Sequence, residues 1–313
     1  MCGCYIDILI VFLGVLMGVA YFTLLERKAL GSFHLRKGPC KVGWLGICQP
    51  LADAVKLFSK EFFCPYTGAK WAFFLAPGAG IFTMCLTWSV LYPNPIFVNT
   101  VSLDVLIFLA ITSLNVYVVM VAGWASNSKY ASLASNRGFA QAISYEVVLT
   151  LISFCFVMLS KSFNFMSISG SPIQHGFVVP LLSLCWLVVI LAEVNRSPFD
   201  FAEAESELVS GYSVEYGGGG FAMLFIAEYG NILFMSYFTA ILLLPCDGGD
   251  VCWWVWNLYT FLKGMLVAYG FLWIRSALPR YRYDLLMLVC WKSVLPGALV
   301  CFLGCFWLAA MGI

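Results

Sequence analysis

Charged side chains are scarce in this sequence. Asp, Glu, Lys and Arg make up 11% of the 313 residues, whereas hydrophobic residues make up 62%. This composition excludes a soluble globular domain, because so much apolar surface could not be hidden from water, and it indicates a protein whose main solvent is lipid. The formal net charge is only +1, so the strongly basic character of a nucleic-acid-binding protein is missing too.

The sequence also lacks the ligand spacing of a metal centre. Its 13 cysteines are scattered without a CxxC motif, and the closest pairs are Cys2–Cys4 and Cys301–Cys305. The two histidines are His34 and His175. Because zinc and iron–sulfur sites need closely spaced ligands, we predict that the chain binds no metal. Most cysteines are then small apolar residues within the membrane.

Long apolar stretches fill most of the chain. The first, from Tyr5 to Leu25, is too long for a signal-peptide core and no cleavage site precedes it, so we expect it to be retained. About eight stretches reach the ~20 residues that a spanning helix needs: 4–25, 71–91, 103–124, 142–160, 177–194, 221–244, 253–274 and 290–311. We therefore predict an all-α integral membrane protein with about eight transmembrane helices in a single domain, residues 1–313. No internal repeat is evident, which weakens the alternative of an inverted-repeat transporter.

Positive charge follows the odd-numbered spans. Nearly all of the 17 Lys and Arg lie in the loops after the first, third, fifth and seventh stretches. The positive-inside rule places these loops in the cytoplasm or the mitochondrial matrix, with both termini on the opposite side.

One segment of the first long loop has an amphipathic pattern. Residues 50–63 read PLADAVKLFSKEFF. One helical stripe would carry Leu51, Val55, Phe58 and Phe62, and another face would carry Asp53, Lys56 and Lys60. This pattern is typical of a helix that lies on the membrane surface. The alternative is that Asp53 faces a cavity where this helix meets the bundle.

A carboxylate-rich stretch follows the fifth span. Residues 193–215 read EVNRSPFDFAEAESELVSGYSVE and hold six carboxylates beside Arg196. Ser197 and Pro198 predict a helix start, which would place Asp200, Glu203 and Glu207 on one face and point Glu205 elsewhere. Neighbouring carboxylates repel and raise one another's pKa. Such a cluster suits a solvated loop or a proton site, and the pattern alone leaves both open.

Carboxylates inside the predicted spans favour the proton site. Glu146 lies near the start of the fourth span, Glu193 at the end of the fifth, and Glu228 within the sixth. An ionised side chain in lipid costs ~3 kcal/mol or more, so such residues usually face protein or water and usually have a function. For Lys263, in the seventh span, a paired or snorkelling charge is the simpler interpretation.

At these residues the sequence resembles a known family. The matching motifs are LLERKALG (24–31), LRKGP (35–39), QPLADAVKLFSKE (49–61), GWASNSKYA (123–131), AQAISYEV (140–147), AEVNRSPFDFAEAESELVSGYSVEY (192–216), AEYGN (227–231) and WIRSALPRYRYDLLM (273–287). They are similar to the first core membrane subunit of proton-pumping NADH:quinone oxidoreductase, respiratory complex I, over nearly the whole chain.

The resemblance implies roles for particular residues. Those expected at the quinone tunnel are Glu26, Arg27, Arg36, Asp53 and Arg275. Those expected in a coupling loop, about 195–220 on the matrix side, are Arg196, Asp200, Glu203, Glu205 and Glu207. Those expected on a proton path toward the pumping subunits are Glu146, Glu193, Glu215 and Glu228.

The resemblance also implies the surroundings of the chain. Ubiquinone would be the substrate, and this chain would bind no flavin, NADH, iron–sulfur cluster or metal. Its partners would be the hydrophilic quinone-site subunits, the small and antiporter-like membrane subunits, and lipids, but no nucleic acid. The richness in Phe and Cys favours the mitochondrial inner membrane over a bacterial plasma membrane.

A mechanism follows as a hypothesis. Quinone reduction would change the charge near the acidic loop, whose carboxylates would take up protons and pass the change along the buried acids. Two alternatives remain at this stage: the membrane-anchor subunit of a related hydrogenase-type complex, and an ion or proton transporter without redox chemistry.

Overall fold

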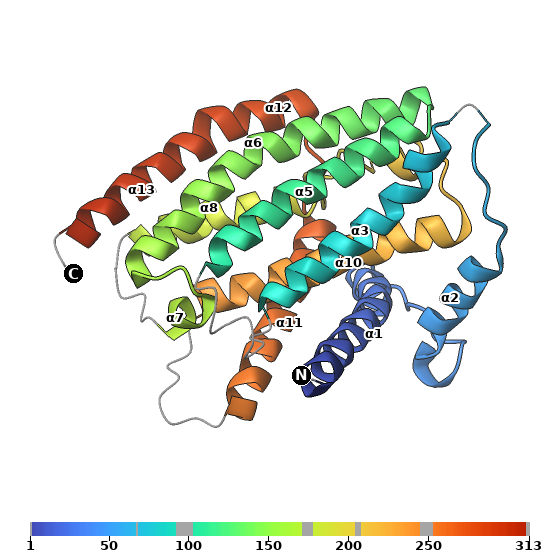
Figure 1. Ribbon diagram of the computed structural model, residues 1–313, viewed down its shortest axis with the longest axis horizontal. Coiled ribbons are helices and arrows are strands. Elements are labelled where there is room, and N and C mark those ends of the chain that lie inside the picture. Colours follow the sequence, from blue (N-terminus) through green and yellow to red (C-terminus); the bar gives the residue numbers. More distant parts are fainter. Residues whose placement is uncertain are drawn as a thin grey trace.

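The protein is an all-α bundle, seen here in a computed structural model (Figure 1). The structure describes residues 2–66, 68–91, 103–170, 178–203, 208–244 and 253–310. Within these ranges there is no β-strand. Six helical stretches are long and apolar enough to cross a membrane: Ile10–Phe33, Lys70–Leu91, Asp104–Ala125, Lys129–Ser160, Gly218–Leu243 and Tyr283–Ala310. The predicted all-α membrane fold is therefore confirmed.

The elements follow one another along the chain with short connections. The α-helices are α1 (Cys2–Phe33), α2 (Gln49–Ser59), α3 (Lys70–Leu91), α5 (Asp104–Ala125), α6 (Lys129–Ser160), α7 (Phe165–Gly170), α8 (Val178–Glu193), α10 (Gly218–Leu243), α11 (Trp253–Ala277), α12 (Tyr283–Val289) and α13 (Leu295–Ala310). The short turns are η1 (Trp44–Gly46), η2 (Gly211–Ser213) and the π-helical turn η3 (Cys290–Val294), which joins α12 to α13 without a break.

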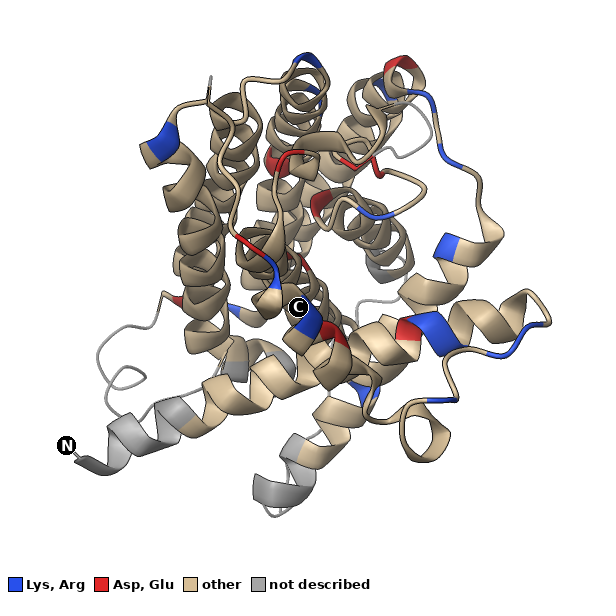
Figure 2. Ribbon diagram, turned by 90° about the vertical axis from the view of Figure 1, so that its right-hand side faces the viewer, with Lys and Arg blue, Asp and Glu red and all other residues tan. Residues whose placement is uncertain are grey.

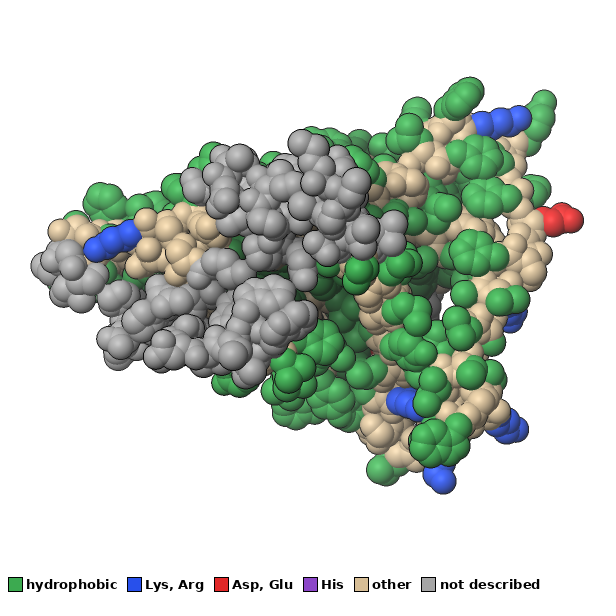
Figure 3. Space-filling view, turned by 60° about the horizontal axis from the view of Figure 1, so that its bottom comes forward, with side chains coloured by type: hydrophobic (Ala, Val, Ile, Leu, Met, Phe, Trp, Pro, Cys, Tyr) green, Lys and Arg blue, Asp and Glu red, His purple; other side chains and the backbone are tan. Residues whose placement is uncertain are grey.

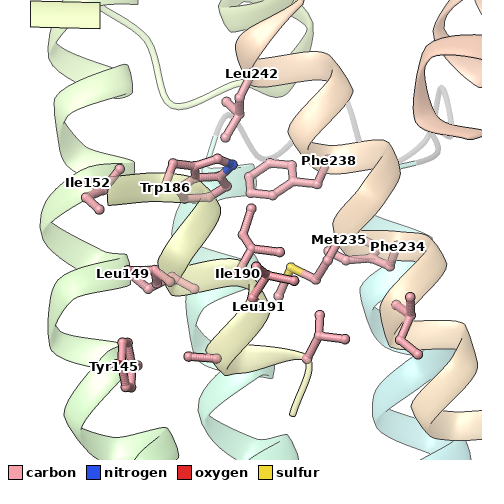
Figure 4. Packing of buried hydrophobic residues seen from close by; sticks show 14 of the residues in the cluster. Tyr145, Leu149, Ile152, Trp186, Ile190, Leu191, Phe234, Met235, Phe238 and Leu242 are labelled. Atoms are coloured by element: carbon pink, nitrogen blue, oxygen red, sulfur yellow. The ribbon is translucent and has the colours of Figure 1, made fainter. Parts of the chain in front are cut away.

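Helix α10 lies inside the bundle and packs against α1, α3 and α11, while α6 packs against α5, α8 and α13. Aromatic side chains fill the space between these helices. Trp186 of α8 meets Phe238 of α10 with ring centroids 5.6 Å apart, and Phe108 of α5 meets the same ring at 4.6 Å (Figure 4). Because these rings are almost completely buried, the interior is packed apolar material rather than a pore.

Two helices extend beyond the predicted spans toward the charged end of the bundle. Helix α1 continues to Phe33, and α6 begins at Lys129, where the Ser128 hydroxyl accepts a hydrogen bond from the Ala131 N–H at 3.4 Å. Residues 129–141 are small or polar, so an apolar-stretch criterion passes over them although they are helical. The first turns of α3, α6, α10 and α12 consequently gather at one end of the bundle (Figure 1).

The helix start predicted at Ser197 is wrong. Residues 196–203, here called the acidic segment, contain no helix, and the Ser197–Pro198 peptide bond is cis. Phe199 and Phe201 are instead buried, with 7% and 1% of their surfaces exposed. Burial of these two rings outweighs the local capping signals. Asp200 and Glu203 therefore share no helix face, and Glu205 and Glu207 lie outside the described residues.

Helix α2 presents its apolar stripe outward. Leu51, Val55 and Phe58 are 57%, 69% and 66% exposed, whereas Pro50 is buried. Its Asp53 points toward α1, where the carboxylate accepts a hydrogen bond from Arg27 Nη1 at 2.6 Å. The helix is thus docked through its polar face, and its apolar face is left for lipid or another chain.

Candidate functional site

The site is centred on Glu26, a carboxylate of α1 that is only 4% exposed. Its Oε1 accepts hydrogen bonds from Nη1 of Arg196, at 2.8 Å, and from Nη1 of Arg275. Its Oε2 accepts one from the Tyr229 hydroxyl at 2.6 Å. Three elements, the acidic segment, α11 and α10, therefore converge on one carboxylate. Two guanidinium groups compensate the cost of burying its charge.

Arg196 connects this carboxylate to a second one. Its guanidinium lies over the Tyr229 ring, 4.5 Å from the ring centroid, and its Nε is 3.6 Å from Oε1 of Glu228 on α10. That distance is an ion-pair contact but too long for a hydrogen bond. Within the described part of the chain, Arg196 Nε and Glu228 Oε2 are both buried without a hydrogen-bond partner. Arg196 is thus held tightly by Glu26 and loosely by Glu228.

Next to Glu228 lies a cavity of about 50 Å³. Its polar lining consists of Asn115, Glu193, Asn195, Glu203, Tyr212, Glu228 and Asn231. Of the buried oxygens without a partner in the described structure, Glu193 Oε2, Asn195 Oδ1 and Glu228 Oε2 belong to lining residues. A polar cavity of this size has room for about three water molecules, which would satisfy such oxygens. The cavity is therefore a place where carboxylates meet water inside the bundle.

Glu203 is the cavity residue contributed by the acidic segment. Burial raises the pKa of its carboxyl well above the ordinary value, and the negative charges of Glu228 and Asp200 raise the pKa further. The Glu203 and Glu228 side chains are also joined by a hydrogen bond. Two carboxyl groups can hydrogen-bond to each other only when one is protonated. The pair can accordingly hold one proton between the segment and α10.

The structure divides the predicted site residues into those that meet in this cluster and those that do not. Glu26, Arg196, Glu203, Arg275, Glu193 and Glu228 meet around Arg196 and the cavity. Asp200, also buried, is paired with Arg280 Nη2 at 3.0 Å. Figure 2 shows acidic residues among the helices and most Lys and Arg on the surrounding loops.

The other candidates lie apart from the cavity. Arg27 and Asp53 form a partly exposed pair that fastens α2 to α1, and Gln49 Nε2 also donates to Asp53 at 3.0 Å. Arg36 is exposed after α1, and Glu215 is half-buried between η2 and α10. Glu146 is half-buried on α6, close enough to Glu193 for their charges to interact. The idea that Asp53 faces a closed cavity is wrong, because its side chain is 35% exposed beside Arg27.

Sequence reasoning missed three residues of the site. Tyr229 and Arg280 were present in the quoted motifs without a role. Gln141 of α6 is completely buried, and its Nε2 donates to the carbonyl oxygens of Ala192 and Phe199, both at 2.9 Å. The available signal was a glutamine at the edge of an apolar stretch, where a polar side chain needs a buried partner.

The described residues contain no group of three or more His, Cys, Asp or Glu that could hold a metal ion. The acids of the site are paired with arginines instead. Fold and site together define a multi-pass helical membrane protein with a hydrated carboxylate cluster beside a buried arginine.

Comparison with known proteins identifies the family. The family model described as NADH dehydrogenase matches residues 6–306, and the chain belongs to this family. It is 47% identical over 287 residues to the NADH-ubiquinone oxidoreductase chain 1 of Aedes aegypti, covering 91% of this chain and 89% of the relative. The protein of that name from Heterololigo bleekeri is 49% identical over 286 residues, covering 91% and 90%. That from Emballonura alecto is 42% identical over 304 residues, covering 96% and 94%.

Proposed function

We propose that this chain is a membrane subunit of proton-translocating NADH:ubiquinone oxidoreductase, that it forms the membrane part of the quinone-access tunnel, and that it couples quinone reduction to proton translocation. Family membership and the names of the relatives support the subunit assignment. The finer roles rest on the geometry of the charged cluster. Ubiquinone is the substrate in this proposal.

The observation that carries the coupling role is the double contact of Arg196. One cation touches Glu26, among the predicted tunnel residues, and Glu228, beside the hydrated cavity. A change of charge on either side alters the attraction that holds Arg196 to the other. Since the contact to Glu228 is the longer one, it is the contact with room to shorten.

A coupling sequence follows from this arrangement. Two-electron reduction of a quinone consumes two protons, so the local charge changes as the reaction proceeds. Negative charge near Arg275 and Glu26 would draw Arg196 toward that side and weaken its attraction to Glu228. Glu228, left with less compensation, would then take up a proton from Glu203 or from cavity water. Glu193 and then Glu146 would respond, because each lies near the next negative charge.

The proposed environment is the mitochondrial inner membrane, with both termini in the intermembrane space. The face in Figure 3 is covered largely by hydrophobic side chains, and Lys and Arg are gathered at one end of it. That distribution suits a bilayer along the flank and a hydrophilic partner at the charged end. The partners there would be the quinone-site subunits of the hydrophilic arm, with other membrane subunits along the flanks.

The test is Glu203→Gln in the assembled complex. The amide keeps the shape of the side chain but cannot release a proton. We expect at least a tenfold loss of NADH:ubiquinone turnover and of coupled proton pumping, with NADH oxidation by ferricyanide unchanged, because an artificial acceptor bypasses this subunit. Asp284→Asn, an exposed carboxylate paired with Arg282, is the control. Wild-type ubiquinone turnover in an assembled Glu203→Gln complex would overturn the proposal.

A further inference from the structure

The acidic segment is gripped along its length by the connection between α11 and α12. Residues 198–201 and 280–283 lie side by side. Arg280 Nη2 is 3.0 Å from Asp200 Oδ2, and the Tyr281 N–H donates to the Pro198 carbonyl oxygen at 3.1 Å. The ring of Phe199 stacks on that of Tyr281 at 5.9 Å, and the ring of Phe201 meets that of Tyr283 edge-on at 6.0 Å. Four contacts of different kinds thus repeat residue by residue.

The ion pair has the only charges among these four contacts, and it reaches the cavity directly. The Asp200 side chain is 9% exposed and that of Arg280 26%, so water screens their attraction poorly. The other oxygen of Asp200 accepts a hydrogen bond from the backbone N–H of Glu203 at 3.2 Å. One carboxylate therefore connects Arg280 to the backbone of the cavity acid.

We propose that Arg280 is a positioning residue for the cavity: its ion pair with Asp200 holds the acidic segment against the α11–α12 connection and so fixes the place and the electrostatic surroundings of the Glu203 carboxyl. This inference rests on the proposed function, because Glu203 is taken there as a proton-exchanging group. The position of the segment, however, can be measured without any activity.

The electrostatic consequence has a definite sign. Glu203 is faced by Asp200 and Arg196 from its own segment, by Glu228 of α10, by Glu193 of α8 across the cavity and by Tyr212 of η2. Arg280 offsets the negative charge of Asp200. Removing Arg280 leaves Asp200 unopposed and raises the pKa of Glu203 further, whereas removing the Asp200 charge lowers that pKa. The two substitutions act in opposite directions although both break the same ion pair.

The experiment compares Arg280→Gln with Asp200→Asn in the assembled complex. Ubiquinone turnover that needs a protonated Glu203 declines as pH rises through its pKa. We expect this alkaline decline to move upward by about half a pH unit or more in Arg280→Gln and downward by a similar amount in Asp200→Asn. Arg282→Gln is the matched control, because Arg282 pairs with exposed Asp284 in the same stretch. Shifts of the same sign, or no shift in either variant, would overturn the inference.

A second measurement tests the position of the segment alone. In hydrogen–deuterium exchange, a peptide covering 197–203 is expected to exchange at least tenfold faster in Arg280→Gln than in Arg282→Gln. Equal exchange would overturn the positioning role, whatever the turnover. Wild-type turnover of Glu203→Gln would instead sink the proposed coupling and leave the exchange result standing. If Arg280→Gln does not assemble, Arg280→Lys keeps the charge, so its pH profile should match the wild type, and a displaced profile would overturn the inference.

Discussion

Arg196 Nη1 lies 2.8 Å from Glu26 Oε1 although 170 positions separate the two residues in the chain. Both side chains are almost completely buried, at 10% and 5% exposure. No local pattern brings them together, because they lie on different elements that meet only when α1 packs beside α10. Their contact is therefore a property of the bundle, and it can be probed by substitution.

Replacing Arg196 with Gln should be strongly disruptive. It leaves Glu228 with no arginine contact and Glu26 with Arg275 alone, and breaking a buried pair on one side costs about 3 kcal/mol or more. We expect reduced assembly and at least a tenfold loss of ubiquinone turnover. Arg27→Gln removes an exposed pair worth at most about 1 kcal/mol and is the comparison. Equal thermal inactivation midpoints of the two variants would contradict this assignment.

Gln141→Leu should loosen the end of α8. The leucine has nearly the same volume but cannot donate to the carbonyls of Ala192 and Phe199, which then stay buried with fewer partners. The expected destabilisation is about 2–4 kcal/mol, seen as faster thermal inactivation of the complex. Gln49→Leu removes one partly exposed hydrogen bond to Asp53 and should cost less than about 1 kcal/mol. A Gln141 variant as stable as the Gln49 variant would show that the two bonds matter little.

Gly211→Ala should be poorly tolerated. Gly211 has φ +63°, and an added Cβ would lie 1.8 Å from the Ala202 carbonyl oxygen, beside Glu203. Left-handed backbone and this clash together cost more than about 3 kcal/mol. We expect loss of assembled complex on native gels. Gly217→Ala, with nothing within 4 Å of its Cβ, should assemble normally. Normal assembly of both variants would contradict the close approach of these two turns.

Stability should depend on pH through Glu203. Its folded pKa is raised above the ordinary 4.5, so the folded protein binds a proton more tightly than the unfolded chain. The contribution to stability is therefore present at low pH and is lost as pH rises from near 4.5 through the raised folded pKa. Glu203→Gln should remove this decline, so the variant gains on the wild type as pH rises. Thermal inactivation midpoints measured across pH check the sign, with Asp284→Asn as the control. A gap that narrows with rising pH would refute it.

The membrane fold could be predicted from the chain because apolar length is a local property. Spans of ~20 apolar residues are recognisable one by one. The same criterion misplaced the start of α6, because Lys129 to Gln141 is helical without being apolar. It also allowed a helix at Ser197, since capping residues indicate what a segment can form rather than what packing requires. Phe199 and Phe201 had to be buried, and burial produced an irregular segment.

The candidate site could be predicted as a set of residues but not as an arrangement. Glu26, Arg196, Glu203 and Glu228 stood out because charge inside apolar sequence is costly. Their partners did not, because Tyr229, Arg280 and Gln141 are ordinary residues until the fold places them against a carboxylate or a carbonyl. Glu215 carried the same charge signal as Glu193, yet it lies between η2 and α10 rather than on the cavity.

The sequence by itself determined that this protein lies in lipid, is helical, and concentrates acids after its fifth predicted span, because composition and spacing act over short distances. Only the tertiary structure decided that Arg196 lies between Glu26 and Glu228, and that Arg280 holds Asp200. These pairs join positions far apart in the chain. Their energies depend on burial and on distances of a few ångströms, which only helix packing sets.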